Sequence, residues 1–523
     1  MYERNAFGNP DGSRTEITDM MLEFIVFDKK YFSSGVASTD DMKTRVIVGA
    51  KGSGKTVYLR RMRTNLKLNS SIYVNEIENE LPSTDLIVKF SQCFSDNELT
   101  EKWMYVWRFA ILRAVISNIL KNREWNTEVS ENDKNRLLEY EDTIFPHYNV
   151  PMSIYSETRN ILTNYSTRNS FNEYASKRQW DEIEVIISEI LLNLPPIYFF
   201  IDSVDEEYAH APMYWLRCQK GLFYRVMRFF RNNVYGNKLH VVISIRDTVL
   251  ASVYKSEHQT RYINEEHIKI LNWDYHTIKY FFENKVLKLK ECFFIKECQE
   301  KTVENWLGIQ EIENVQRKLK EPITQYILRH TRLLPRDVVI MGNSLAEVKS
   351  MITNDSTLDI QKLIRKKVSK AAKSFGNELL QICANQIINN EMPKGAANRE
   401  YSEVYTSIKE YNESITQRIK EILMLLSSDK FTWNDILALQ NNADEVLGEN
   451  NNMFDTLWQN GAIGYIDEGP NGRDEVFFID DEYEEFLLPR NKKVYILRSC
   501  IIDAIGMSGA DWDKNPVIGG SSE

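Results

Sequence analysis

The sequence predicts an α/β protein: a five-stranded parallel sheet flanked by helices, then a helical region, then a C-terminal winged helix. Three observations predict this fold. Short β-branched and aromatic runs alternate with long amphipathic stretches as far as Trp273, which is typical of a parallel sheet. Apolar residues then recur every three or four positions, which indicates helices. After residue 411, three helical segments precede a hairpin pattern.

Five runs read as strands of the sheet, at Arg45–Val48, Ser71–Val74, Ile197–Ile201, Leu239–Ile245 and Ile268–Leu271. We therefore expect an N-terminal segment over 1–44 and a sheet domain over 45–273. Helical periodicity with polar breaks predicts a helical insertion at about 85–190, between the second and third strands.

The remainder of the chain divides into three further parts. Segments 275–290, 311–330 and 335–352 have helical spacing, which predicts a helical lid or bundle over 274–410. Helices at 414–428 and 431–442, a third from 453, and a two-stranded hairpin turning at 468–473 predict the winged helix over 411–500. We expect residues 501–523 to be a flexible tail.

Composition excludes several classes of protein. The 523 residues are 43% hydrophobic and 27% charged, which fits a multidomain globular chain. The 65 Lys and Arg against 75 Asp and Glu give a net charge of −10, which disfavours a nucleic-acid-coating protein. The six cysteines lack CxxC spacing, no signal peptide is evident, and Arg108 and Arg113 interrupt the most apolar stretch. We expect a cytoplasmic protein without a membrane partner.

The strongest motif is a phosphate-binding loop. Gly49, Gly54, Lys55 and Thr56 satisfy GxxxxGK[ST] between an apolar strand and an amphipathic helix. Glycines let backbone amides wrap a phosphate, and the helix directs its positive dipole end at the anion. Lys55 is expected to reach the β- and γ-phosphates and the Thr56 hydroxyl to ligate Mg²⁺. The predicted nucleotide-binding residues are Gly49, Ala50, Lys51, Gly52, Ser53, Gly54, Lys55 and Thr56.

An acidic run follows the third strand in PPIYFFIDSVDEEY. Its first carboxylate, Asp202, is expected at the carboxyl edge of the sheet, where it would contact Mg²⁺. Asp205 and Glu206 are candidates for polarising an attacking water, and Glu206 is the preferred base. The alternative is a solvated acidic cap on the next helix.

Two further segments offer polar side chains to the same site. The strand LHVVISIRD ends in Ser244 and Arg246, which we expect between the phosphate-loop strand and the acidic strand. Ser244 would contact the attacking water or γ-phosphate, and Arg246 would neutralise charge on the transferring phosphoryl group. In TRLLPRDVV, Arg336 is a candidate nucleotide contact from the lid. A surface arginine and an ion pair at the start of a helix are the respective alternatives.

The segments GAKGSGKT, FFIDSVDEE, VVISIRD and LLPRD, followed by a winged helix, resemble the ASCE division of P-loop ATPases, on its AAA+ and STAND side. The opening FGNPDGSRTE is similar to that of bacterial predicted ATPases related to the KAP and STAND groups. The resemblance implies ATP as the nucleotide, hydrolysis that switches a conformation or a homo-oligomer, and a role in bacterial anti-phage defence. STAND proteins usually carry a repeat sensor and an N-terminal effector domain. Neither is recognisable here, so we expect a separate effector protein as partner, or a sensor or effector role for the insertion.

Two other functions stay open: a nucleic-acid-engaged motor or loader, and a nucleotide-binding scaffold with little turnover. The stretch Asp444–Asn460, around the expected DNA-reading helix, contains four carboxylates and no Lys or Arg. It would therefore repel phosphates, and nucleic acid is the less favoured partner. The basic run Lys362–Lys373 keeps that partner open, although such runs are more often a solvated helix face.

Overall fold

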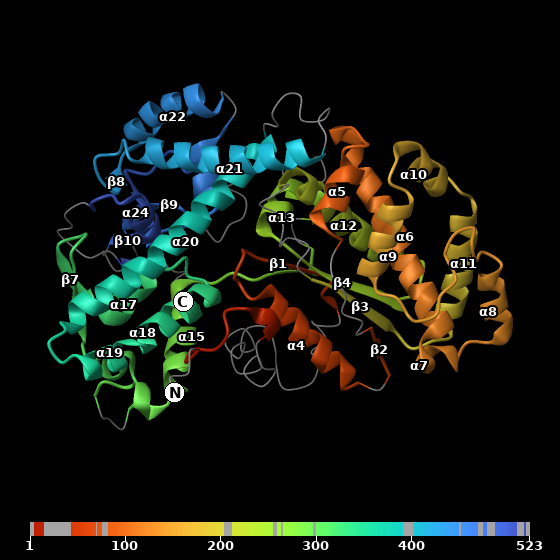
Figure 1. Cartoon of the computed structure of the whole chain (residues 1–523), viewed down its shortest axis with the longest axis horizontal. Helices are drawn as coiled ribbons and strands as arrows, with labels where there is room; N and C mark the ends of the chain where they lie inside the picture. The colour runs from red at the N-terminus through yellow and green to blue at the C-terminus, as the bar shows by residue number, and fades with distance from the viewer. Residues whose placement is uncertain are drawn as a thin grey trace.

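The computed structural model describes residues 5–14, 43–69, 71–75, 82–202, 212–254, 259–262, 265–296, 300–390, 401–448, 451–468, 474–478, 487–509 and 517–518. The molecule is elongated (Figure 1). A parallel sheet lies near its centre, a group of helices forms one end, and further helices with a second sheet form the other.

The central sheet has five strands in the order β2-β3-β4-β1-β5, and each neighbouring pair is parallel. The parallel sheet predicted from the sequence is thus confirmed, and β4 lies between β1 and β3 as expected. The strands are β1 (Val46–Val48), β2 (Tyr73–Val74), β3 (Ile197–Ile201), β4 (Leu239–Ile245) and β5 (Ile268–Ile270).

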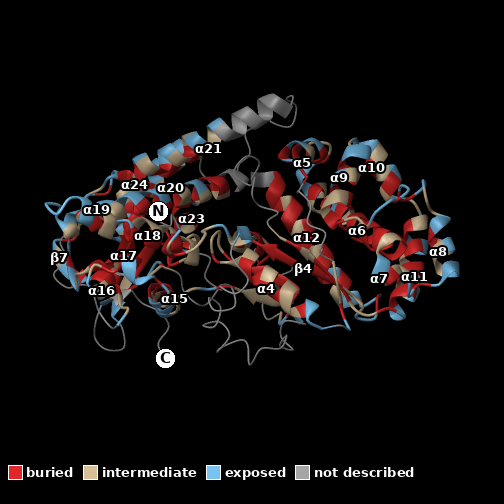
Figure 2. Cartoon of the chain, turned by 60° about the horizontal axis from the view of Figure 1, so that its bottom comes forward, coloured by how far each residue is buried: buried red, intermediate tan, exposed pale blue. Residues whose placement is uncertain are grey.

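Helices cover both faces of this sheet, so its central strands are buried along their length. Alternate residues point to opposite faces, as strand geometry requires. Ile47, Tyr198 and Val242 pack with α4 (Lys55–Lys67) on one face. Residues of the opposite phase pack with the long helices α6 (Asp96–Lys121) and α12 (Pro212–Asn232). Figure 2 shows the buried strands between these layers.

The segment between β2 and β3 is helical, in agreement with the predicted insertion. Its central helix, α6, starts with a capping box between Ser95 and Glu98, and its apolar half is buried against α9 of the insertion and α12 beyond it. No helix in the described ranges is both long and apolar enough to cross a bilayer. Around α6 lie α5 (Thr84–Ser91), α7 (Arg123–Asn126), α8 (Glu131–Leu138), α9 (Ile154–Asn164), α10 (Arg168–Ala175) and α11 (Gln179–Leu192).

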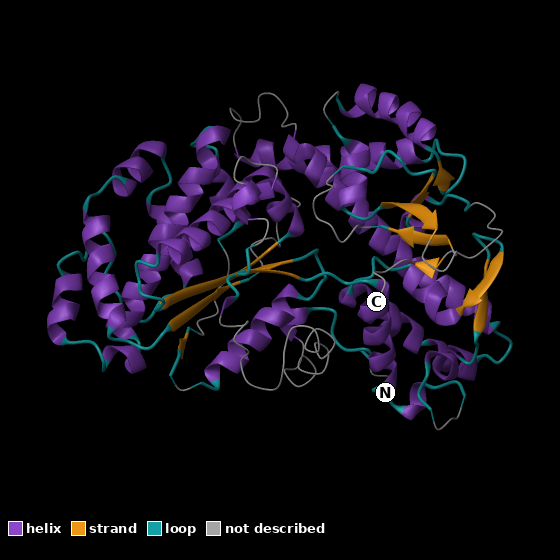
Figure 3. Cartoon of the chain, turned by 180° about the vertical axis from the view of Figure 1, so that it is seen from behind, coloured by secondary structure: helices purple, strands orange, loops and turns teal. Residues whose placement is uncertain are grey.

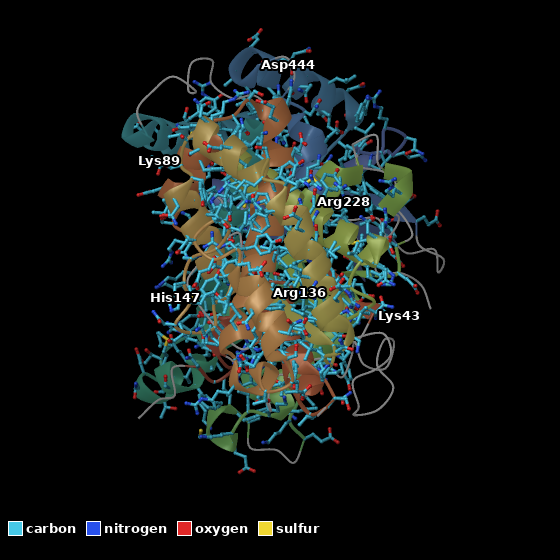
Figure 4. All side chains as sticks on the ribbon, turned by 90° about the vertical axis from the view of Figure 1, so that its right-hand side faces the viewer. Lys43, Lys89, Arg136, His147, Arg228 and Asp444 are labelled. Carbon is cyan, nitrogen blue, oxygen red and sulfur yellow. The ribbon has the colours of Figure 1, made fainter. Side chains whose placement is uncertain are left out.

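Charged side chains cover the outer surface of the insertion (Figure 4). Arg136 on α8 pairs with Asp133 of its own helix and with Glu189 of α11. His147 pairs with Glu141 in the loop before α9. These contacts are exposed and contribute little to stability, so the insertion is held together by its aromatic core.

Helices dominate the chain after the central sheet, as predicted. The longest is α20 (Ile360–Asn390), which packs against α18, α21, α23 and α24. The others are α13 (Asp247–Tyr254), α14 (Gln259–Tyr262), α15 (Tyr275–Leu287), α16 (Val303–Leu307), α17 (Ile323–Arg329), α18 (Pro335–Ala346) and α19 (Val348–Asn354).

The helix predicted over 311–330 is wrong in its first half. That half is a β-hairpin of β6 (Glu311–Asn314) and β7 (Leu319–Pro322), followed by α17. Residues of β6 are alternately exposed and buried, and Lys318 in the turn has a positive φ of 52°. Pro322, which would break a helix, ends β7. The two-residue alternation was the signal for a hairpin.

The C-terminal region contains a second sheet, in the order β12-β10-β9-β11-β8 (Figure 3). All its pairs are antiparallel except β10 with β12. The predicted hairpin corresponds to β9 and β10, and the other strands were not predicted. The elements are α21 (Tyr401–Leu423), β8 (Lys430–Phe431), α22 (Trp433–Leu447), α23 (Met453–Gln459), β9 (Ile463–Glu468), β10 (Asp474–Phe477), β11 (Val494–Leu497), α24 (Ser499–Ile505) and β12 (Val517–Ile518).

Residues 501–505 differ from the flexible tail that we expected over 501–523, because they belong to α24. Cys500, Ile501 and Ile502 of α24 are fully buried. A Cβ atom on Gly376 of α20 would lie only 2.0 Å from the Cys500 carbonyl oxygen, so the two helices pack in close contact. The apolar pattern of 499–505 belongs to the core and not to a tail.

Candidate functional site

The carboxyl ends of β1, β3 and β4 bring three predicted site segments to one edge of the sheet. Ile201 pairs with Ile243, and Ile47 pairs with Ser244. Asp202, which follows β3, therefore lies beside Ser244, whose Oγ donates a hydrogen bond to the Asp202 Oδ1 at 2.5 Å. The predicted proximity of the acidic segment and the end of β4 is present in the structure.

The loop 49–56 joins β1 to α4 at this edge. Gly52 and Gly54 have φ values of 96° and 97°, which residues with a Cβ rarely adopt. A Cβ on Gly49 would lie 2.4 Å from the Ser53 Oγ. Outside the loop, the indole Nε1 of Trp273 donates to the Ser53 carbonyl at 2.9 Å. The loop thus has a specific backbone shape that its glycines permit and Trp273 supports.

Lys55 folds back over the loop that precedes it. Its ammonium donates to the carbonyl oxygens of Gly49 and Ala50, at 2.9 and 3.0 Å. Thr56 follows in the first turn of α4. Gly54 occupies the N-cap position and has no side chain with which to cap the helix. The positive end of the helix dipole therefore meets the loop at a residue without a side chain.

Arg336, the candidate from the lid, lies against the same loop. Its backbone amide donates to the Gly52 carbonyl at 3.3 Å, and a Cβ on Gly52 would be 3.0 Å from the Arg336 Cβ. Pro335 occupies the first turn of α18, where a missing amide hydrogen costs nothing, and so starts the helix at this point. The region 331–337, 279 residues or more beyond Gly52 in sequence, thus contacts the loop directly.

Two buried polar atoms at the loop have no hydrogen-bond partner among the described residues. They are the Ser53 Oγ and the Arg336 Nε. Leaving a buried donor unpaired costs free energy, so such atoms are informative in a folded protein. A hydroxyl and a guanidinium beside glycine amides and a lysine form a donor set that suits an anion.

A carboxylate that the sequence analysis missed, Glu378 of α20, pairs with these cations. Its Oε1 lies 2.9 Å from the Lys51 Nζ and 3.9 Å from the Arg336 Nη1. Its Oε2 lies 2.9 Å from the Arg332 Nη2. Burial alone would raise the pKa of the Glu378 carboxyl. The positive charges of Arg332, Lys51 and Arg336 outweigh that effect and lower the pKa to about 2. No local motif marks this residue, because its partners lie far away in sequence.

The N-terminal residues connect α18 to α4. The Phe7 amide donates to the Asn343 side chain of α18 at 2.8 Å, and Asn343 donates back to the Gly8 carbonyl at 3.0 Å. A few residues later, the Gly12 carbonyl accepts from Arg60 of α4 at 2.7 Å. The segment 5–14, part of the N-terminal segment expected over 1–44, therefore belongs to the surroundings of the loop.

The helical insertion also reaches the carboxyl edge of the sheet. The hydroxyl of Tyr155 on α9 donates to the Asp202 carbonyl. Asn75, immediately after β2, donates to Asn118 of α6 at 3.0 Å. The insertion and the end of β3 are thus in direct contact.

Of the remaining predicted site residues, some lie in the described part of the chain and others do not. Arg246 is buried directly after β4. Asp205 and Glu206 lie outside the described residues. Thr56 and Asp202 offer oxygen ligands, which Mg²⁺ prefers. A group of three or more His, Cys, Asp or Glu side chains suited to a metal ion does not occur in the described part of the chain.

The order of the five parallel strands, flanked by helices, is consistent with an α/β core of the ASCE or P-loop type. No protein-family model matches the chain, and no curated protein is significantly similar to it.

Proposed function

We propose that this chain is an ATPase that binds Mg-ATP in the loop 49–56 and switches its conformation or assembly on hydrolysis. One observation carries the proposal. A GxxxxGKT sequence forms a loop with two positive-φ glycines, between strand β1 of the central sheet and helix α4, at the sheet edge that also holds Asp202. This is the structural context that gives the motif its meaning.

The residues present suit a magnesium triphosphate. Backbone amides of the loop and the uncapped end of α4 would hold phosphate oxygens, and the orphaned Ser53 Oγ and Arg336 Nε would gain partners. Lys55, now bonded to two loop carbonyls, would exchange them for phosphate. Asp202 and Thr56 would hold Mg²⁺, which when bound neutralises phosphate charge.

Each predicted catalytic residue has a separate task in the proposed hydrolysis. Glu206, or Asp205 in its place, accepts the proton of the attacking water. Ser244 orients the Asp202 carboxylate through their 2.5 Å hydrogen bond, and it would contact the attacking water or the γ-phosphate. Arg246 stabilises the charge that develops on the transferred phosphoryl group.

The family resemblance supports the more specific parts of the proposal. It favours ATP over GTP, since a phosphate loop does not read the base. It also favours a homo-oligomer or a separate effector protein as partner, a cytoplasmic location and a role in anti-phage defence. The order α21, β8, α22, α23, β9, β10 supports a winged helix. That module would act by packing, because the Gln386 side chain of α20 contacts Gln459 of α23 and Asn460 just after it.

A nucleic-acid-engaged ATPase is the second candidate, because α20 carries a stripe of exposed cations. Lys362, Lys366, Lys370 and Lys373 are all exposed, at helical spacing. Such a stripe suits a phosphate backbone. DNA-stimulated turnover that falls steeply with salt would favour this candidate over a partner-protein switch.

Turnover by the purified protein tests the main proposal. We expect Mg-dependent release of phosphate from ATP, and Glu206→Gln should retain ATP while lowering its hydrolysis at least about 100-fold. A scaffold without turnover would give the same low rate for both proteins. Wild-type protein that releases no phosphate, with or without a partner or DNA, would contradict the ATPase assignment.

A further inference from the structure

Glu378 stands where a negatively charged phosphate tail would have to compete with it. It contacts Lys51, which belongs to the phosphate loop itself, and Arg336, which packs on Gly52. Its other oxygen contacts Arg332, but Arg332 already has a two-oxygen contact with Asp337 at 2.7 and 2.9 Å. Glu378 is thus the carboxylate that pairs with Lys51 of the loop and with Arg336 packed on it.

The charges of this cluster show why the carboxylate matters. Lys51, Arg332 and Arg336 carry three positive charges, while Asp337 and Glu378 carry two negative ones. A triphosphate brought to the loop would meet a carboxylate on the same cations. Like charges at short range oppose each other most strongly in a partly buried site, and Glu378 has a side-chain exposure of only 26%.

Glu378 is also connected to the C-terminal part of the molecule. Its neighbours on α20, Gly376 and Asn377, contact Cys500 of α24 and Lys420 of α21. Behind Arg332, the Thr331 carbonyl accepts a hydrogen bond from Arg498, which precedes α24. A change in the Glu378 contacts would therefore be felt by elements that do not touch the loop.

We propose that Glu378 is a positioning residue that holds Lys51 and Arg336 in the absence of nucleotide and sets the preference of the site for triphosphate over diphosphate. The inference rests on the proposed nucleotide site. Incoming phosphates displace the carboxylate from both cations, and α20 loses its direct tie to the loop. Since the competition is electrostatic, it acts most on the ligand with the most negative charge at this end.

The test is calorimetric titration of wild type and Glu378→Gln with Mg-ATP and with Mg-ADP. Removing the competing charge should tighten ATP binding about tenfold and ADP binding about threefold at most, so that the ADP-to-ATP ratio of dissociation constants rises. Both gains should shrink as salt is raised. A merely structural role would loosen the protein without this dependence on phosphate number.

Glu347→Gln is the matched control. Glu347 also pairs with a lysine of α20, Lys367, but that contact is about 16 Å along the helix from Glu378. Its substitution removes one negative charge and should leave both dissociation constants unchanged. If Glu378→Gln does not fold, Glu378→Asp replaces it, because the shorter side chain keeps the charge near Arg332 and withdraws it from Lys51; about threefold tighter ATP binding is then expected.

The outcomes separate the two proposals. Equal ATP dissociation constants in wild type and the Glu378 variant, or weaker binding by the variant, would overturn the role of Glu378 and leave the nucleotide site standing. Binding of neither nucleotide by wild type and variant alike would overturn the site itself, and the inference with it.

Discussion

At the scale of single residues, the proposed phosphate loop depends on glycines for two separable reasons. Gly52 needs its positive φ, and it also leaves the space that Arg336 occupies, 3.0 Å from where a Cβ would be. The effect of backbone strain can therefore be separated from the effect of a clash with Arg336. Another glycine of the chain, Gly506, has a positive φ but no close neighbour.

Gly52→Ala should abolish detectable Mg-ATP binding and lower the free energy of unfolding by about 1–2 kcal/mol. Gly506 has a φ of 73° and no atom within 4 Å of its would-be Cβ. Gly506→Ala should therefore lose similar stability and bind nucleotide normally. Calorimetric titration and denaturant unfolding of both variants check this; normal binding by Gly52→Ala would refute the assigned loop geometry.

The hydrogen bond from Ser244 to Asp202 predicts a kinetic effect. Ser244→Ala should lower kcat about tenfold, because an unsupported carboxylate positions its ligands less well, and should change KM less than about threefold. Steady-state phosphate release measures both constants. Ser252, whose hydroxyl bonds within α13 to the Val249 carbonyl, provides the control variant Ser252→Ala. A large rise in KM with kcat unchanged would instead give Ser244 a role in binding.

These residues also show which part of the site the sequence reveals. The loop, Asp202 and Ser244 lie beside strand ends, and a parallel sheet brings strand ends together whatever the details of packing. Glu378 and Trp273 reach the loop through tertiary packing of remote segments, which no local pattern encodes. Arg336 was predicted as a site residue only because it lies in the LLPRD motif.

At the scale of elements, the apolar core of the helical insertion contains a buried ion pair. Arg113 of α6 and Glu157 of α9 lie 2.5 Å apart, with exposures of 2% and 0%. Burial raises the pKa of Glu157, while Arg113 opposes that rise. Because α9 also carries Tyr155, which bonds to Asp202, the pair orients the helix that touches the candidate site.

Glu157→Gln should destabilise the protein by about 3 kcal/mol, because it leaves the Arg113 charge buried without a countercharge. The exposed pair of Lys279 and Glu283 on α15, 3.8 Å apart, gives the comparison. Glu283→Gln should change the unfolding free energy little. Denaturant unfolding monitored by tryptophan fluorescence measures both. Equal effects of the two substitutions would show that the buried pair is not needed for the fold of the insertion.

Helices and strands were predictable where the apolar residues of a segment followed a single spacing. All five strands of the central sheet are apolar runs, and the structure places them within two residues of the predicted limits. Segment 311–330 contains a two-residue alternation followed by a helix. Because we predicted one helix over the whole segment, we missed the hairpin in its first half. The strands β8, β11 and β12 are short, and their pairing depends on partners distant in sequence.

At the scale of the whole molecule, α20 joins parts that are far apart in the chain. It packs against the helices α18, α21, α23 and α24, and through Glu378 it contacts Lys51 of the loop 49–56. In Figure 1 it runs through the end of the molecule that also contains the second sheet. The fit between α20 and α24 is therefore expected to govern the stability of that end.

Gly376→Ala tests this fit through the sign of its effect. In an ordinary helix interior the substitution stabilises by about 1 kcal/mol. Here the new Cβ would meet the Cys500 carbonyl at 2.0 Å, and separating the helices should cost about 2–3 kcal/mol instead. Thermal unfolding distinguishes the two signs. A variant more stable than wild type would mean that α24 does not pack on α20 as described.

The central claim is that the loop 49–56 encloses the phosphates of a nucleotide, and the most direct measurement is Mg-ATP binding by wild type and Lys55→Ala under identical conditions. The account predicts a dissociation constant for the variant at least about 100-fold weaker, since a charge-assisted contact to the phosphates is lost. Wild type and variant that bind Mg-ATP equally well would contradict it.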